Sequence, residues 1–194
     1  MRKALLFLVL ALAVGGASAQ SSLRVRGTIT AIDGDVLAVK TREGQDLRLR
    51  LPADTSVAVA RAAKFEDIKK GDYLGAAAMK RPDGALVALE LHYLAATVPA
   101  GHTPWDLEPG STMTNAHVEA VVAGTGAREV TVQYLSGTQR LLVPEGIPIV
   151  RAGPGTRADL KPGEYIFAAV NVAADGSMTA PRIQVSKDGV KPPQ

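Results

Sequence analysis

The chain has 194 residues, a formal net charge of +3 at pH 7 and no cysteine. The lack of cysteine excludes a disulfide framework, a thiol nucleophile and lipid anchoring of the kind that acylates a cysteine. Hydrophobic residues make up 46% of the sequence and aromatic residues only 4%, so the cores must be built from aliphatic side chains.

The first 19 residues have the pattern of a secretory signal peptide. Arg2 and Lys3 precede an apolar run over residues 4–14, and small residues follow at positions 17–19. A transmembrane anchor is the alternative, but spanning a bilayer takes about 20 apolar residues and this run is shorter. We expect cleavage near Ala19-Gln20 and a periplasmic or secreted protein that neither spans a membrane nor carries a lipid anchor. Loss of two basic residues would leave it nearly neutral.

Short stretches of the exported chain recur at one constant spacing. Residues 67–74 (DIKKGDYL) recur as residues 159–166 (DLKPGEYI), and Asp83-Gly84 recurs as Asp175-Gly176. Several landmarks that keep one spacing predict a duplicated module. We therefore expect a first module over residues 20–94 and a second over residues 116–186.

Within each module, apolar and polar residues alternate with the period of half-buried strands. Leu47 and Leu49, for example, alternate with arginines, and Asp-Gly or Glu-Gly pairs between such runs are typical of hairpin turns. Residues 62–70 are the one predicted helical turn of the first module. The predicted strands are 23–32, 35–41, 46–51, 55–59, 72–80 and 84–94, then 116–123, 128–135, 138–143, 147–151, 164–173 and 177–186.

Five or six short antiparallel strands per module predict an all-β protein made of two tandem small barrels. A partly open barrel like the OB-fold is the nearest standard architecture, because closure limits exposed sheet edges. A pair of small sandwiches is the alternative. A parallel α/β fold is not expected, because no amphipathic segment of helix length separates the strands.

Between the modules, residues 95–115 are predicted to form a loop that carries the only tryptophan of the sequence, Trp105. A tryptophan in a loop usually buries its ring against a neighbouring domain. We therefore expect a groove between the modules around Trp105, Asp106 and Glu108, and this groove is the predicted functional surface. Residues 187–194 are polar and end in prolines, which predicts a flexible tail.

Several of these segments resemble a known group of proteins. The residues concerned are 27–32 (GTITAI), 67–72 (DIKKGD), 83–86 (DGAL), 105–115 (WDLEPGSTMTN) and 189–193 (GVKPP). Together they are similar to proteobacterial exported proteins of unknown function that are built from tandem small β-barrel domains. The resemblance implies a barrel module and a periplasmic location, but no activity and no catalytic residues.

The sharpest chemical candidate is a transition-metal site. His92 follows Glu90 by two residues, His117 precedes Glu119 by two, and His102 lies in the linker between them. If the strands that carry them lie side by side, imidazoles and carboxylates could bind Zn²⁺, Ni²⁺ or Cu²⁺. The alternative is that all three histidines are ordinary solvent-facing residues.

A second candidate is a basic face. Arg24 and Arg26 on the first strand, with Arg48 and Arg50 on the third, could form one stripe on a barrel wall. No aromatic residue lies among these arginines, so nucleic acid is not an expected partner, and an anionic glycan or lipid head group suits an exported protein better. A solvated outer face is the alternative.

No catalytic motif is present: the sequence lacks a Gly-x-Ser-x-Gly elbow and a phosphate-binding glycine loop. We therefore expect a non-enzymatic binding or interaction protein without a cofactor. Its partner would be a periplasmic protein or one of the anionic ligands above, and periplasmic metal binding through the three histidines is the second hypothesis.

Overall fold

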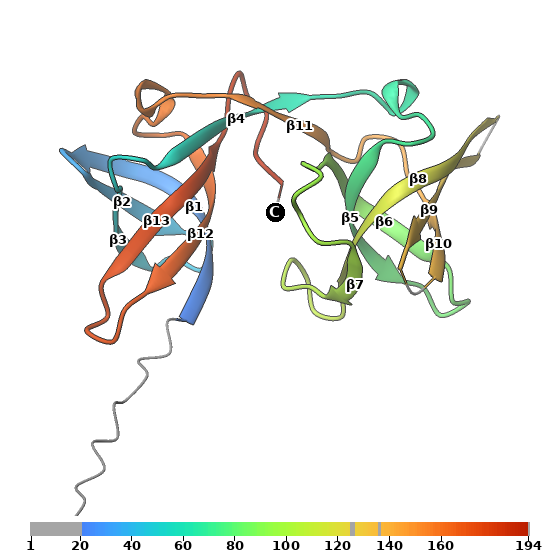
Figure 1. The fold of residues 1–194 in the computed structure, drawn as a ribbon, viewed down its shortest axis with the longest axis horizontal. Coiled ribbons are helices and arrows are strands. Elements are labelled where there is room, and N and C mark those ends of the chain that lie inside the picture. The colour runs from blue at the N-terminus through green and yellow to red at the C-terminus, as the bar shows by residue number, and fades with distance from the viewer. Residues whose placement is uncertain (1–20, 125–126, 136, 194) are drawn as a thin grey trace, which may run out of the picture.

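The computed structural model describes residues 21–193 except 125–126 and 136, so the predicted signal peptide lies outside the described residues (Figure 1). These residues form an all-β fold with two short 3-10 turns, η1 (Phe65–Asp67) and η2 (Arg157–Asp159), which confirms the predicted class. The thirteen strands are β1 (Ser21–Asp33), β2 (Val36–Thr41), β3 (Asp46–Arg50), β4 (Ser56–Ala62), β5 (Tyr73–Lys80), β6 (Leu86–Tyr93), β7 (Gly101–Pro104), β8 (Thr112–Gly124), β9 (Ala127–Tyr134), β10 (Gly137–Leu142), β11 (Ile149–Pro154), β12 (Tyr165–Val172) and β13 (Met178–Val185).

The first barrel is built from strands at the two ends of the chain. β1 pairs antiparallel with both β2 and β12, β2 pairs with β3, and β12 pairs with β13. β13 then runs parallel to β3 where Thr179 faces Arg50, which closes the ring. This strand order is that of the five-stranded OB-fold barrel, in which the first strand pairs on both sides and the third and fifth are parallel.

The second barrel is built from the middle of the chain. β8 pairs antiparallel with β5 and β9, β9 pairs with β10, and β5 pairs with β6. β10 closes the ring by running parallel to β6. All five strands therefore lie between Tyr73 and Leu142, and the second barrel is contiguous in sequence whereas the first is not.

This pairing corrects the predicted division into a barrel over residues 20–94 and another over residues 116–186. The hairpin β5–β6 pairs with β8 rather than β1, and the hairpin β12–β13 pairs with β1 rather than β8. The change of barrel occurs at β4. This strand pairs with β13 of the first barrel at its start and with β11, which adjoins the second barrel, at its end. There β4 and β11 pair antiparallel from Ala58 to Ala62 and bridge the two barrels (Figure 1).

The hydrophobic cores combine the same segments. In the first core Ile29, Leu37 and Leu49 pack with Ile166 and Ile183, all of them 0–1% exposed. Burying such an aliphatic side chain contributes about 1.5–3 kcal/mol, so the β12–β13 hairpin supplies a large share of the first barrel's stability.

The second core has the same construction. Leu74 and Leu91 from the β5–β6 hairpin pack with Val130, Val132 and Leu141 from β9 and β10, and each of these side chains is at most 1% exposed. As predicted from composition, both cores are essentially aliphatic.

The linker and the tail are more ordered than predicted. Residues 95–115, predicted as a loop, contain the strand β7 and also the start of β8 at Thr112, and these two strands pair with each other. The tail folds back at Lys187–Val190, where the two residues exchange backbone hydrogen bonds around Asp188 in the left-handed region. Pro192 and Pro193 are buried. The predicted flexible tail is therefore wrong for residues 187–193, because this turn directs the prolines into the space between the barrels (Figure 1).

Candidate ligand cavity between the barrels

A tight turn fixes the position of Trp105. The backbone N–H of Trp105 donates to the carbonyl of Ser111 at 2.8 Å, and the Ser111 hydroxyl donates to the carbonyl of Glu108 at 2.7 Å and to that of Trp105 at 3.1 Å. Ser111 is 2% exposed. These hydrogen bonds from a buried serine fix the backbone of the turn, and thereby the point from which the Trp105 side chain extends.

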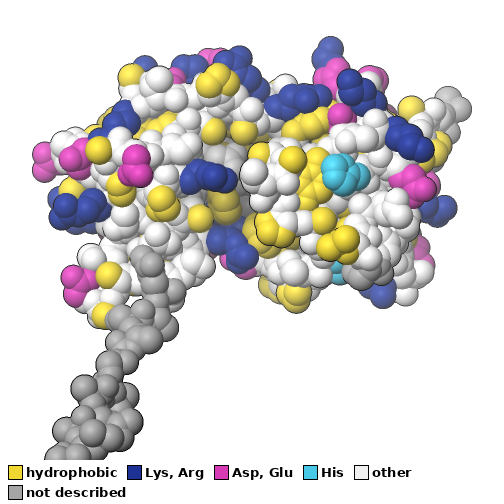
Figure 2. Space-filling view, in the orientation of Figure 1, with side chains coloured by type: hydrophobic (Ala, Val, Ile, Leu, Met, Phe, Trp, Pro, Cys, Tyr) yellow, Lys and Arg dark blue, Asp and Glu magenta, His cyan; other side chains and the backbone are white. Residues whose placement is uncertain are grey.

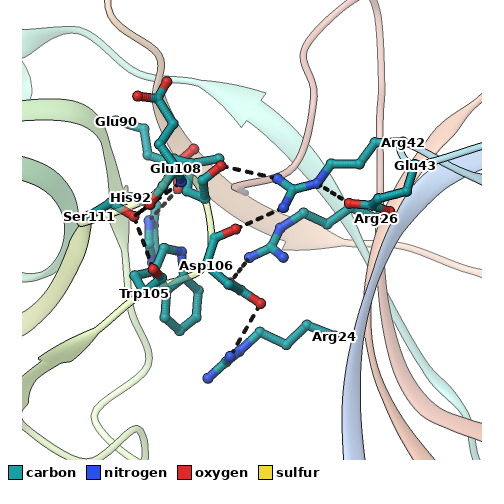
Figure 3. A network of polar contacts seen from close by, with 11 residues as sticks. Arg24, Arg26, Arg42, Glu43, Glu90, His92, Trp105, Asp106, Glu108 and Ser111 are labelled. Atoms are coloured by element: carbon teal, nitrogen blue, oxygen red, sulfur yellow. Dashed lines mark hydrogen bonds and ion pairs between the residues drawn. The ribbon is translucent and has the colours of Figure 1, made fainter.

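Three arginines of the first barrel bind this turn (Figure 3). Arg26, itself 3% exposed, donates from Nη2 to Oδ1 of Asp106 at 2.8 Å, and Arg24 reaches Oδ2 at 3.4 Å. Arg42 donates to the backbone carbonyl of Asp106 at 2.7 Å. The guanidinium carbon of Arg24 also lies 4.1 Å from the centre of the Trp105 ring, within cation–π range. The linker is therefore fastened to the first barrel although its strand β7 belongs to the second.

The charge state of Asp106 supports this attachment. Burial acts to raise the pKa of Asp106, but the hydrogen bond from Arg26 and the charges of Arg26 and Arg24 outweigh burial and hold the pKa below its usual value. The carboxylate is therefore ionised at neutral pH. Its contribution to stability is present above the ordinary aspartate pKa and is lost as pH falls through the lower, native pKa.

Replacing Asp106 with alanine should loosen the linker. Arg26 would keep its buried charge without the carboxylate, and we expect a loss of about 1–2 kcal/mol in the free energy of unfolding, reduced from a fully buried pair because Asp106 is half exposed. Urea unfolding followed by Trp105 fluorescence measures it. Asp106→Asn is the control, since it still accepts a hydrogen bond and should lose less. An unchanged unfolding midpoint in Asp106→Ala would contradict the assigned role.

A cavity of about 440 Å³ lies beside Trp105, between the barrels and beneath the β4–β11 bridge. Its walls come from both barrels, the bridge, the linker and the tail. Figure 2 shows hydrophobic and basic side chains together in the groove between the two barrels. The lining residues are Ser56, Ala58, His92, Tyr93, Leu94, Ala95, Thr97, Val98, Trp105, Met113, Asn115, Ala152, Phe167, Ala169, Arg182, Gln184 and Pro193.

His92 contributes a neutral ring to this cavity. The residue is 9% exposed, and burial lowers the pKa of its imidazole to about 4. Its Nδ1 lies 3.7 Å from Oε1 of Glu90, too far for a hydrogen bond, so at neutral pH the contact is not an ion pair. Gly75 provides the space for the ring, because a Cβ at that position would lie 2.2 Å from Nε2 of His92.

The three histidines do not form the predicted metal site. His102 contacts Oγ1 of Thr114 at 2.8 Å and stacks on Tyr134, whereas His117 lies against Tyr73, at a ring-centre distance of 4.6 Å. Over the described residues, no group of three or more histidine, aspartate or glutamate side chains is placed to hold a metal ion. The prediction failed because Glu90 and His92 face the inter-barrel space, whereas His102 and His117 are held by separate partners on β7 and β8.

The predicted basic face is also divided. Arg24 and Arg26 face residues of β12 and bind the linker, whereas Arg48 and Arg50 are exposed on β3 opposite Ala38 and Val36. The four arginines therefore do not share one stripe, because Arg48 is level, through Ala38 of β2, with Ala31 of β1, further along that strand than Arg24 and Arg26.

The three residues predicted to form the inter-module groove have different roles. Trp105 lines the cavity, Asp106 binds two arginines, and Glu108 is exposed and serves the turn through its backbone. Sequence reasoning missed Phe167, Arg182 and Gln184, because β12 and β13 were assigned to the other barrel. In this exchange of hairpins, β12–β13 joins the first barrel and β5–β6 joins the second. The constant spacing in the sequence does not reveal it, since both hairpins carry the same pattern.

These features define a class of architecture: an all-β protein with two five-stranded barrels, one contiguous and one discontinuous, and a cavity between them. No protein-family model, curated protein or solved structure matches the chain. The resemblance to proteobacterial exported proteins therefore stays a prediction. In the part of the chain that is described, no helix is long and apolar enough to cross a membrane.

Proposed function

We propose that the protein is an exported, non-enzymatic binding protein that holds a small molecule in the cavity between its barrels. The observation that carries this proposal is the cavity itself. Its volume of about 440 Å³ falls in the range of ligand pockets, roughly 300–1,000 Å³. Its lining is mainly aliphatic and aromatic with a few polar groups, which is the composition of small-molecule sites.

The surroundings of the cavity support binding rather than catalysis. The Ser111 hydroxyl donates to backbone carbonyls, so it serves the turn and does not pair with a histidine base. Among the described lining residues His92 is the one histidine, and within the described chain no hydrogen bond joins its ring to a serine or threonine hydroxyl; its nearest charged neighbour is Glu90, at 3.7 Å. Export is supported by the signal-peptide pattern of residues 1–19.

Fluorescence of Trp105 tests the proposal directly, because it is the only tryptophan and lines the cavity. We expect at least one member of a panel of small apolar compounds, neutral and charged, to change its emission saturably and to raise the melting temperature. A ligand at 100 times its Kd stabilises the native state by about 2.7 kcal/mol.

A cavity-filling variant locates the site. Ala169 is an exposed residue of the lining, so Ala169→Phe should leave the fold intact and abolish binding. Ala31→Phe is the matched control on an exposed position of β1 outside the lining. Failure of every panel member, or binding that survives in Ala169→Phe, would refute the proposed function.

A further inference from the structure

The charged groups around the cavity are distributed unevenly. Of the described lining residues, Arg182 alone carries a full charge at neutral pH, because the other polar members are hydroxyls, amides and the neutral imidazole of His92. None of these described residues is an aspartate or a glutamate. The cavity therefore presents one positive group in a mainly apolar space.

The exchange of hairpins brings Arg182 to the cavity. It lies on β13 opposite Ala169 of β12 and beside Ser56 of β4, and both of these residues also line the cavity. Its side chain is exposed, and within the described chain no ion pair, hydrogen bond or aromatic contact involves it. Of the other arginines near the lining, Arg24 and Arg26 are already engaged by Asp106, and Arg151 lies over the ring of Tyr93. Arg182 is thus the guanidinium available to a ligand.

The opposite wall, as far as its residues are described, carries no positive charge. In the second barrel, Glu90 occupies the position that Arg182 occupies in the first: Glu90 faces Ala77 on β5, as Arg182 faces Ala169 on β12. Glu90 is 4% exposed, is not part of the lining and has its Oε1 3.7 Å from Nδ1 of His92. A negative group would therefore bind toward β13 and away from β6.

The remaining walls suit an apolar body. Trp105, Phe167 and Met113 provide aromatic and thioether surfaces, and Ala58 and Ala152 form the roof on the bridging strands. Gln184, two residues after Arg182 on the same face of β13, adds an amide that can donate to a carboxylate oxygen. A multiply hydroxylated glycan would leave most of its hydroxyl groups unsatisfied against these walls.

From this arrangement we infer that the ligand is an apolar carboxylate: one carboxylate bound by Arg182, on an aliphatic or aromatic body that contacts Trp105 and Phe167. This inference rests on the proposed function and specifies its ligand class. An arginine fork matches a carboxylate with two parallel hydrogen bonds, which gives the pair more strength and selectivity than a lone charge would.

Three probes of one chain length separate the alternatives: decanoate, decanol and decylamine, each titrated below the concentration at which it forms micelles, with Trp105 emission as readout. We expect decanoate to bind about tenfold more tightly than decanol, and decylamine to bind most weakly. Arg182→Gln should weaken decanoate binding about tenfold and leave decanol binding unchanged. Arg182→Lys, which keeps the charge but not the fork, should fall between wild type and Arg182→Gln.

Arg48→Gln is the matched control, because Arg48 is an exposed arginine on β3 outside the cavity and its loss should change neither affinity. Melting curves establish that each variant folds. Equal binding of decanoate and decanol, or decanoate binding that Arg182→Gln does not weaken, would overturn the inference while leaving the proposed function in place. If none of the three probes binds, the inference fails, and the broader panel then decides the proposed function separately.

Discussion

A fragment of residues 63–149 should fold on its own as a monomeric barrel. It contains all five strands of the second barrel together with Phe65 and Val143, two buried residues of the same core. Every strand of that barrel keeps its barrel neighbours within the fragment, and the buried core is complete. The fragment loses only the end of the pairing between β6 and β11, where Val150 faces His92. We expect dispersed NMR spectra and a single cooperative unfolding transition.

Residues 20–94, which the repeat in the sequence suggests as a module, should behave in the opposite way. They hold β1–β3 without β12 and β13, and β5–β6 without β8–β10, so neither ring of strands is complete. We expect no cooperative unfolding of a monomer. A well-folded monomer of residues 20–94, with an unfolded fragment of residues 63–149, would show that each half closes on itself.

Stability should fall steeply between pH 6.5 and pH 4 because of His92. Burial lowers the pKa of its imidazole from 6.5 to about 4, so in this range the unfolded chain binds a proton that the native chain does not. Stability therefore decreases as pH falls, with a maximum loss of about 3 kcal/mol once pH reaches the native pKa. The nearby Glu90 carboxylate, 3.7 Å away, is the acidic group that faces the ring.

Replacing His92 with glutamine should remove this part of the pH dependence. Glutamine already occupies the equivalent place in the first barrel, where Gln184 faces Phe167 as His92 faces Gly75. Urea unfolding at pH 7, 5.5 and 4 measures the difference from wild type, and His117→Gln is the control on an exposed histidine. Parallel pH profiles for wild type and His92→Gln would contradict the buried, neutral state of His92.

Local structure could be predicted from the sequence because it depends on neighbouring residues. The alternation around Leu47 and Leu49 gave β3, and Asp83-Gly84 gave the turn before β6, where Gly84 has the positive φ of 89° that glycine tolerates. Trp105 lines the cavity between the barrels, but its residue is only partly buried, whereas the rule for loop tryptophans predicts a buried ring.

Strand pairing could not be predicted in the same way. Leu74 and Ile166 are both large aliphatic residues at equivalent positions, and either could fill either core, so periodicity does not say which hairpin joins which barrel. The sequence does not indicate that Arg182 belongs to a site, because it is a single arginine between apolar residues. Its proposed role depends on the lining residues that the exchange of hairpins places beside it. The buried prolines of the tail were missed because polar, proline-rich ends are usually frayed.

The exchange of hairpins joins the two barrels and thereby creates the cavity between them. Engineered disulfides test this exchange most directly. The chain has no cysteine of its own. Ser22 faces Asn171 across β1 and β12, and Met79 is the residue of β5 at the place equivalent to Asn171. Paired residues on neighbouring strands have Cα atoms about 4.5–5.5 Å apart, within disulfide range. Under mild oxidation, Ser22→Cys/Asn171→Cys should form a disulfide within the monomer and Ser22→Cys/Met79→Cys should not, whereas the reverse result on a non-reducing gel would contradict the exchange.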